Sequence, residues 1–295
     1  MGEFKSGFVH VLGPANVGKS TYINATVGAK VTVTSDKPQT TRNRIRCIST
    51  TENEQVVFLD TPGIHRPVNK LGKYLMKEAR RALKGSDVLL YMVEPRGKIS
   101  KYDQAMLDKL KGLEAPRILL LNKIDVYGKE DIARTLEVYS SEEAFDEYIP
   151  ISALEGTNID LAHRKLVERL PEGPLLFPEG IDTDSPLEFI VAEYVREKVY
   201  RLTHEEVPYS VAVKTTSVEE NPEQELMEIY AKIYVARESQ KGILIGKRGS
   251  MIKKIGRKAR KDLERRLGVQ VYLDLTVSVN KNWNRDQDKI ESLYN

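Results

Sequence analysis

The chain has 295 residues, a formal net charge of +3, and 40% hydrophobic and 30% charged residues, which are the proportions of a soluble globular protein. This length allows two domains, each with its own core. No apolar run approaches the ~20 residues that span a bilayer, and residues 1–7 lack a signal-peptide pattern. The single cysteine, Cys47, excludes an intrachain disulfide framework and is expected to be a packed thiol. We therefore expect a cytoplasmic protein without a transmembrane segment.

The first motif that carries chemistry is Gly13–Ser20, which fits the pattern G-x-x-x-x-G-K-S/T of a phosphate-binding loop. The apolar run Phe8–Leu12 before it predicts a strand, and Thr21–Val27 after it predicts a helix. Glycines let a polyphosphate approach the backbone N–H groups, and the helix N-terminus adds partial positive charge. Lys19 is expected to reach the β- and γ-phosphates, and the Ser20 hydroxyl is expected to bind Mg²⁺.

Short apolar runs alternate with helical patterns from this loop to about Leu170. The clearest predicted strands are Val56–Asp60, Val88–Val93, Arg117–Asn122 and Tyr148–Ser152. Helices are predicted between them, for example at Leu71–Lys84 and Gln104–Leu113. The alternation predicts a mostly parallel sheet with helices on both faces. Such sheets bind ligands at the carboxyl ends of their strands, where the remaining motifs are expected to meet.

The segment Asp60–Gly63 has the sequence Asp-Thr-Pro-Gly and directly follows a predicted strand. Asp60 is expected to hold Mg²⁺ through a water molecule, and the Gly63 N–H is expected to meet the γ-phosphate and sense its loss. A threonine in the polar loop before this strand can complete the Mg²⁺ shell while the γ-phosphate is present. Thr41 is the preferred candidate for that role, and Thr40 is the alternative.

A base-reading motif, Asn122-Lys123-Ile124-Asp125, follows the next strand but one. Guanine presents two donors, N1–H and the exocyclic amine, which one carboxylate can accept as a pair, whereas adenine lacks that amine. The Asp125 carboxylate would be left unpaired against adenine, so the motif selects GTP over ATP. A small-molecule kinase with the same phosphate loop would have no use for it. In the tripeptide Ser152–Leu154, the Ala153 N–H is expected to donate to guanine O6.

Helix and strand breakers at Leu170–Pro174 and Phe177–Gly180 predict a linker between two domains. We expect a nucleotide-binding domain at residues 1–172, a linker at 173–185 and a second domain at 186–295. The second domain has a different order of elements. A helix is predicted at Leu187–Leu202, and strands are predicted at Tyr209–Val218, Glu228–Arg237 and Gln270–Val279.

A Gly-x-x-Gly loop lies between the last two predicted strands, after an apolar lead-in and before a helix that runs to about Leu267. In this setting the loop is the signature of KH domains, which clamp the backbone of single-stranded nucleic acid. Lys241–Arg266 contains eleven basic residues against Asp262 and Glu264, the charge pattern of a nucleic-acid-binding surface. We expect RNA contacts from Gly246, Lys247, Arg248, Gly249, Lys253 and Arg257.

The five motifs of the first domain, in this order, resemble the translation-factor-type GTPases, and their details resemble the Era family within that class. The second domain resembles the KH domain of the same family, so the resemblance covers essentially the whole chain. It implies an α/β P-loop GTPase domain followed by an α+β KH domain of type II. The resemblance is carried by Gly13–Ser20, Gln39–Arg42, Asp60–His65, Glu205–Val213, Ser239–Gly242 and Ile252–Arg260.

The resemblance also implies a function. It implies a cytoplasmic, monomeric GTPase that converts GTP to GDP and phosphate with Mg²⁺, binds the 3′ region of 16S rRNA rather than DNA, and acts as a GTP-dependent switch in assembly of the 30S subunit. Peripheral association with the inner face of the cell membrane is left open. Ile64 stands where signalling GTPases have a water-orienting glutamine, so hydrolysis is expected to be slow without activation. A nucleotide-gated RNA-binding chaperone with negligible turnover is the alternative.

Family members implicate a potassium ion held partly by the loop asparagine, so Asn16 joins Lys19 and Thr41 as a residue with an expected catalytic role. The chain departs from the family pattern at Pro14–Ala15, Tyr22 and Arg248, and the effect of these departures is open. The expected metal ligands are Ser20, Thr41 and Asp60. The expected GTP contacts are Gly13, Asn16, Val17, Gly18, Lys19, Ser20, Thr21, Asp60, Gly63, Asn122, Lys123, Asp125, Ser152, Ala153 and Leu154.

Overall fold

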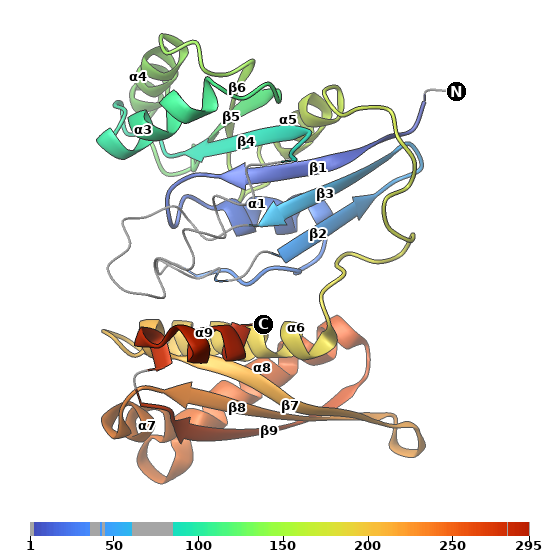
Figure 1. Ribbon diagram of the computed structural model, residues 1–295, viewed down its shortest axis with the longest axis vertical. Coiled ribbons are helices and arrows are strands. Elements are labelled where there is room, and N and C mark those ends of the chain that lie inside the picture. Colours follow the sequence, from blue (N-terminus) through green and yellow to red (C-terminus); the bar gives the residue numbers. More distant parts are fainter. Residues whose placement is uncertain (1–2, 36–41, 43–44, 61–84, 282, 295) are drawn as a thin grey trace. The chain divides into compact units, whose positions relative to one another are not determined.

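The computed structural model of the protein describes residues 3–35, 42, 45–60, 85–281 and 283–294. These residues form two compact units (Figure 1). The first unit holds the phosphate loop and continues to Asp184, and the second takes the chain from Ser185 onward together with residues 33–35.

The first unit is built on a six-stranded sheet in the order β2-β3-β1-β4-β5-β6 (Figure 1). Strand β2 is antiparallel to β3, and every other neighbouring pair is parallel. The prediction of a mostly parallel sheet is therefore confirmed. The strands are β1 (Lys5–Leu12), β2 (Ile45–Thr50), β3 (Glu54–Asp60), β4 (Val88–Val93), β5 (Arg117–Asn122) and β6 (Glu147–Ile151).

Helices cover both faces of this sheet, as predicted. Leu12 and Tyr91 belong to a buried cluster that also contains residues of α3 and α4. Phe58 pairs with Val9, whose side chain points to the opposite face from Leu12, and it meets Tyr22 of α1 edge to face, with ring centroids 6.1 Å apart. The helices of this unit are α1 (Lys19–Val27), α3 (Lys101–Leu110), α4 (Lys129–Ser140) and α5 (Ile159–Val167).

The segment after α5 is fastened along the side of the sheet formed by β2 and β3. The buried side chain of Gln55 accepts the N–H groups of Leu176 (2.7 Å) and Phe177 (2.8 Å) and donates to the Phe177 carbonyl (2.9 Å). The Ile48 N–H donates to the Asp182 carbonyl at 2.8 Å. The Ile48 bond pairs one outward N–H of the edge strand β2, which would otherwise be open to pairing with another chain.

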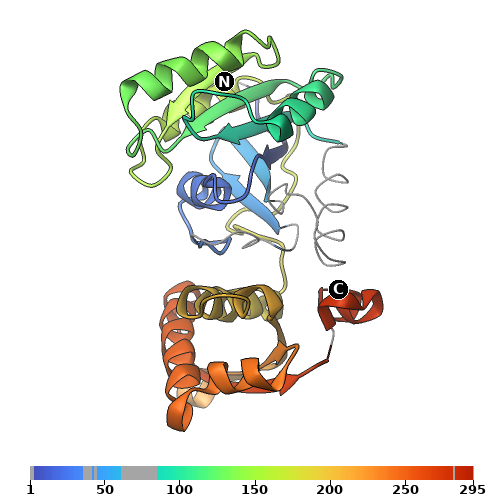
Figure 2. The ribbon, with the colours of Figure 1, turned by 90° about the vertical axis from the view of Figure 1, so that its left-hand side faces the viewer.

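The second unit has a three-stranded sheet in the order β7-β8-β9, with β7 antiparallel and β9 parallel to β8 (Figure 1). Figure 2 shows the same unit turned by 90°. Its buried apolar core contains Val195 and Val199 of α6, Ile255 and Ala259 of α8, and Ile233 of β8. Its elements are α6 (Leu187–Leu202), β7 (Ala212–Asn221), β8 (Leu226–Val235), α7 (Glu238–Ile245), α8 (Ser250–Leu267), β9 (Gln270–Val279) and α9 (Gln287–Tyr294). Short 3₁₀ turns lie at Pro208–Ser210, Pro222–Gln224, Lys247–Gly249 and Trp283–Arg285.

The observed α6 and β9 match the predicted ranges, whereas β7 begins at Ala212 because the 3₁₀ turn Pro208–Ser210 occupies the predicted start of that strand. Cys47 is a buried thiol, as predicted. The predicted helix Leu71–Lys84 lies outside the described residues. Among the helices that the structure describes, none combines the length and the apolar character that crossing a membrane requires.

Candidate nucleotide-binding and RNA-binding sites

The phosphate loop turns sharply between β1 and α1, and two glycines permit the turn. Gly13 (φ 139°) and Gly18 (φ 105°) both have positive φ angles. A Cβ at Gly13 would lie 2.2 Å from the carbonyl oxygen of Met92, and a Cβ at Gly18 would lie 2.2 Å from Nδ2 of Asn122. Neither position can therefore carry a side chain in this arrangement. Because α1 begins at Lys19, its first N–H groups face back toward the loop.

Lys19 is buried beneath this loop. Its Nζ donates to the carbonyl oxygens of Gly13 (3.1 Å) and Pro14 (2.7 Å). Burial lowers the pKa of Lys19 to about 8, and the nearby charge of Asp60 opposes part of that shift. An ammonium group that is desolvated in this way gains strongly from an anionic ligand. The position therefore suits the predicted contact with β- and γ-phosphates.

Ser20 and Asp60 come together at the end of β3. The Ser20 Oγ donates to Oδ2 of Asp60 at 2.8 Å, and Asp60 is fully buried. Hydroxyl and carboxylate oxygens are ligands that Mg²⁺ prefers, usually alongside waters and nucleotide phosphates. The donor set of this pair therefore fits a magnesium ion that arrives with a nucleotide.

Asn122, the last residue of β5, joins the phosphate loop to the segment that follows β6. Its Nδ2 donates to the carbonyl oxygen of Val17 at 2.7 Å, and its Oδ1 accepts the Ala153 N–H at 2.9 Å. Sequence reasoning assigns that N–H to guanine O6, whereas here it donates to Asn122. The contact with O6 stays a prediction. Ser152 is buried, and its Oγ accepts the Glu155 N–H at 3.1 Å, which closes the turn of this segment.

A carboxylate that sequence reasoning missed, Glu94, lies beside the base-reading motif at the end of β4. It pairs with Lys123, which has a φ of 72°, and it accepts from Arg96 Nε (3.0 Å) and the Tyr127 hydroxyl (3.1 Å). Burial raises the pKa of Glu94, but hydrogen bonds from Lys123 and Arg96 outweigh that effect and lower it. Asp125 is exposed, and its carboxylate makes no hydrogen bond or ion pair with the described residues. It is therefore available to a ligand.

Five further residues with predicted roles at this site divide into two groups. Thr41, its alternative Thr40, and Gly63 lie outside the described residues. Asn16 lies in the phosphate loop with a φ of 63°, a conformation that asparagine tolerates better than most residues, and Thr21 lies in the first turn of α1. The roles assigned to these five residues stay predictions.

In the second unit, the Gly-x-x-Gly segment forms a tight loop between α7 and α8. Gly246 has a φ of 70°, and a Cβ there would lie 2.8 Å from the backbone nitrogen of Met251. Gly249 has a φ of 77° and directly precedes α8. Arg248 has a φ of 53°, a conformation that costs a non-glycine residue about 1 kcal/mol. The loop thus brings Lys247 and Arg248 together at the start of a basic helix.

A groove of about 500 Å³ runs between α8 and the free edge of β9. It contains Lys253 and Arg257, which were predicted to contact RNA, and it adds Arg260, which was not. Sequence reasoning missed the wall opposite these cations. Which residues of β9 face the groove depends on how β9 pairs in the sheet. The groove is lined by Ile252, Lys253, Gly256, Arg257, Arg260, Leu273, Asp274 and Leu275.

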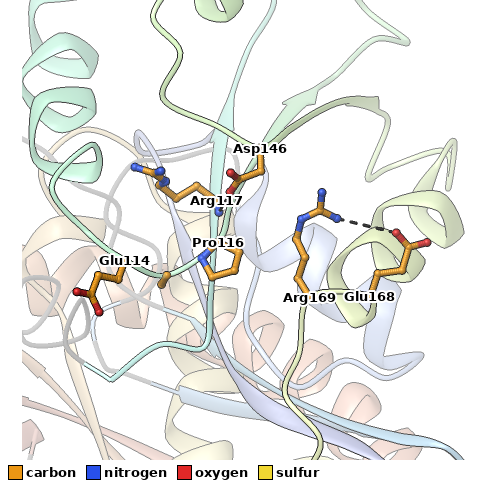
Figure 3. Close-up of a pocket in the computed structure, with 7 residues that line it drawn as sticks. Glu114, Pro116, Arg117, Asp146, Glu168 and Arg169 are labelled. Atoms are coloured by element: carbon orange, nitrogen blue, oxygen red, sulfur yellow. Dashed lines mark hydrogen bonds and ion pairs between the residues drawn. The ribbon is translucent and has the colours of Figure 1, made fainter. Parts of the chain in front are cut away.

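A second hollow, of about 510 Å³, lies in the first unit at the amino end of β5 (Figure 3). Most of its charged groups already bind one another or the backbone. Asp146 accepts the Arg117 N–H at 2.6 Å, and Arg169 lies 4.0 Å from Glu168, the pair joined by the dashed line in Figure 3. It lies at the opposite end of β5 from Asn122 and is not part of the nucleotide site.

Comparisons with known proteins match both units. Residues 8–123 match the family model described as 50S ribosome-binding GTPase, and residues 206–284 match the KH domain model. The GTPase Era of Caldanaerobacter subterraneus subsp. tengcongensis is 47% identical over 97% of this chain and 96% of its own length. The GTPase Era of Alkaliphilus metalliredigens is 45% identical over 98% of this chain and 97% of its own.

Two solved structures are similar over nearly the full length. An Aquifex aeolicus Era variant bound to GDP and AlF₄⁻ has a TM-score of 0.94 at 38% identity, covering 98% of this chain and 99% of its own. An Era in complex with MgGDPNP and nucleotides 1506–1542 of 16S ribosomal RNA has a TM-score of 0.94 at 39% identity, covering 98% of both chains. With a phosphate loop, a base-reading motif and a basic KH groove in one chain of this length, the protein belongs to the Era family of GTPases.

Proposed function

We propose that this protein is a GTPase that binds the 3′ region of 16S rRNA through its KH domain and acts as a GTP-dependent switch in assembly of the 30S subunit. The observation that carries the nucleotide part is the convergence of Lys19, the Ser20–Asp60 pair and the Asn122–Asp125 motif at one edge of one sheet, with Asn122 bonded to the phosphate loop itself. We place the GTPase domain at residues 1–172, the linker at 173–185 and the KH domain at 186–295.

Each part of the nucleotide has residues suited to it. The N–H groups of the phosphate loop and the α1 N-terminus face the phosphates, and Lys19 neutralises charge on the β- and γ-phosphates. Ser20 and Asp60 hold Mg²⁺, which lowers the charge on the leaving group when it is bound. The Asp125 carboxylate accepts the two guanine donors, and Lys123 and Asn122 fix the segment that carries it.

Hydrolysis has to be organised without a glutamine after the Asp-Thr-Pro-Gly motif, because Ile64 stands there. Lys19, Thr41 and Asn16 carry the catalytic roles, with Asn16 contributing to a potassium site. The Aquifex aeolicus Era solved with GDP and AlF₄⁻ supports phosphoryl transfer in this family. We expect phosphate release to be slow in sodium, faster in potassium, and to lose the difference in Asn16→Ala.

The RNA part is supported by the basic groove and by the Era structure that contains nucleotides 1506–1542 of 16S rRNA, an RNA of the small subunit. The family model for residues 8–123 carries the description of a 50S-binding GTPase, so the subunit itself needs a test. Sedimentation with purified 30S and 50S particles, in GDP and in a GTP analogue, is that test. Light scattering tests the proposed monomer, and flotation with anionic vesicles tests peripheral membrane binding.

The decisive experiment for the nucleotide site compares GTP and ATP turnover. Wild-type protein should release phosphate from GTP and not from ATP, and Lys19→Ala should reduce GTP turnover more than 100-fold. Asp125→Ala should lose the preference for GTP. Asp125→Asn should gain turnover of xanthosine triphosphate, because an amide can donate to the C2 carbonyl that replaces the exocyclic amine of guanine. Equal turnover of ATP and GTP by the intact protein would overturn the proposal.

A further inference from the structure

The helical wall of the RNA groove has no side chain at its centre. Ile252, Lys253, Gly256, Arg257 and Arg260 follow the spacing of a single face of α8, and all of them line the groove. Gly256 is in the middle of that set. The adjoining face of the helix carries the buried residues Ile255, Ala259 and Leu263. Gly256 is half-buried and lies where the groove-lining face meets the buried face of α8.

Packing does not require a glycine at this position. Gly256 is not among the residues with a positive φ, so its backbone suits any residue. A Cβ would lie 3.6 Å from Cδ1 of Leu275, which is an ordinary van der Waals contact. A glycine inside a helix nevertheless destabilises the fold relative to alanine. The 18-residue helix α8 thus carries a local loss of stability that nothing in the surrounding structure explains.

We propose that Gly256 is the point where one base of single-stranded RNA lies flat against the backbone of α8. A planar base can approach bare helix backbone closely, whereas a methyl group would hold it away. Ile252 and Leu275 supply apolar surface beside this spot, and Lys253 and Arg257 stand beside it to receive the flanking phosphates. This inference rests on the proposed RNA-binding function and names the residue that positions a base within it.

Charge favours RNA over an acidic peptide as the occupant. The cations Lys253, Arg257 and Arg260 line the groove against one acidic residue, Asp274. A helix or strand of a peptide would present side chains of its own to Gly256 and would gain little from a bare backbone patch. Bases are flat on both faces, and stacking contributes to binding for every base.

The test exploits opposite effects on stability and binding. The probe is an oligoribonucleotide of nucleotides 1506–1542 of 16S rRNA, titrated against full-length protein by fluorescence anisotropy at fixed salt. Gly256→Ala should raise the melting temperature by about 3 °C, because it removes a helix glycine, and should weaken RNA binding about tenfold. Gly256→Leu should weaken binding further. The salt dependence of binding should not change, since no phosphate contact is lost.

The matched control is Gly242→Ala. Gly242 is also inside a helix, α7, and a Cβ there would meet no heavy atom within 4 Å, but it does not line the groove. This variant should raise the melting temperature by a similar amount and leave RNA affinity unchanged. A single-position abasic scan of the oligonucleotide adds a second readout. One abasic site should weaken binding to wild type about tenfold and have no further effect on Gly256→Ala.

Two results would overturn the inference while leaving the proposed function intact. One is wild-type affinity in Gly256→Ala with no sensitive position in the abasic scan. The other is a lower melting temperature in Gly256→Ala, which would assign the glycine to packing against Leu275. A wild-type chain that binds an acidic peptide in place of the oligonucleotide would defeat the proposed function and this inference together.

Discussion

The two binding sites of the molecule are built in different ways. In the nucleotide site, the buried side chains of Lys19, Asp60 and Asn122 are already hydrogen-bonded to neighbouring segments. In the groove, Lys253 and Arg257 are exposed and make no hydrogen bond or ion pair with other described residues. We infer that nucleotide recognition depends on a few fixed directional contacts, whereas RNA affinity depends on summed charge, which salt screens.

Of the variants that test this contrast, Asn122→Ala should have the largest effect, which is on nucleotide affinity. The substitution removes the side chain that hydrogen-bonds the Val17 carbonyl and the Ala153 N–H in a buried environment. Each lost hydrogen bond costs about 1–1.5 kcal/mol. We expect both GDP and GTP to bind about 100-fold more weakly in a fluorescent-nucleotide titration, with RNA affinity measured in the absence of nucleotide unchanged. Asn53→Ala, in an exposed turn between β2 and β3, is the control and should match wild type. Weakened RNA binding in Asn122→Ala would contradict the separation of the two sites.

The next largest effect should be the loss of GDP affinity at high pH, as Lys19 loses its proton. In the empty site its pKa is about 8, so the ammonium loses its proton above that pH. Bound phosphates favour the charged form and raise the pKa in the complex, so binding above pH 8 must take up a proton. GDP affinity should be constant from pH 6.5 to 7.5 and about tenfold weaker one pH unit above the pKa. Lys19→Arg does not titrate in this range, so its profile isolates the lysine from titration of the base. A flat wild-type profile to pH 9 would contradict the assignment.

The two sites also differ in how far the sequence predicts them. The phosphate loop, the Asp-Thr-Pro-Gly segment and the base-reading motif are each short and contiguous, so the sequence alone predicts that Lys19, Ser20, Asp60 and Asn122 meet at one site. Glu94 could not be placed, because it follows β4 whereas its partner Lys123 follows β5, and the two meet only through the pairing of these strands. Short motifs therefore identify the ligand, and sheet order identifies the residues that hold the motifs in place.

The same distinction holds in the second unit. The charge run and the Gly-x-x-Gly loop identified the basic face of α8, and the alternating pattern identified β9. The groove wall at Leu273–Leu275 depends on β9 being an edge strand, and strand order is not visible in a local pattern. Helix α7 was missed because Gly242 and Gly246 lie within and just after it, and glycine weakens a helical pattern.

A smaller effect is expected from Arg257→Ala in the groove. Loss of one cation near a phosphate should reduce the salt dependence of RNA binding by about one counterion and weaken affinity about fivefold at 0.15 M salt. Arg265→Ala removes the same charge from the same helix, but Arg265 pairs with Asp262 and does not line the groove. Anisotropy titrations over a range of salt should show a changed slope for Arg257→Ala alone. Equal slopes in the two variants would mean that only net charge matters.

The smallest effect should be that of Glu94→Gln, and it tests whether the nucleotide site is held in place before its ligand arrives. The amide keeps the shape of the carboxylate but removes the charge that holds the Lys123 ammonium and accepts from Arg96. Because the Glu94 side chain is 10% exposed, this pair is less screened than a surface ion pair. We expect about threefold faster GDP dissociation in stopped-flow measurements, with association and GTP turnover unchanged, since Asn122 and Asp125 remain.

The matched control for this variant is Glu142→Gln. Glu142 holds Lys111 at 3.0 Å on the surface of the same unit, away from the base-reading motif, so this loss of an ion pair should leave GDP dissociation at the wild-type rate. Equal dissociation rates in both variants and wild type would show that Lys123 keeps its position without Glu94. Faster dissociation in Glu94→Gln alone would show that the base-reading motif is positioned by a carboxylate from a neighbouring strand. Directional contacts would then extend one layer beyond the residues that touch the nucleotide, whereas Lys253 and Arg257 of the groove have no such supporting layer among the described residues.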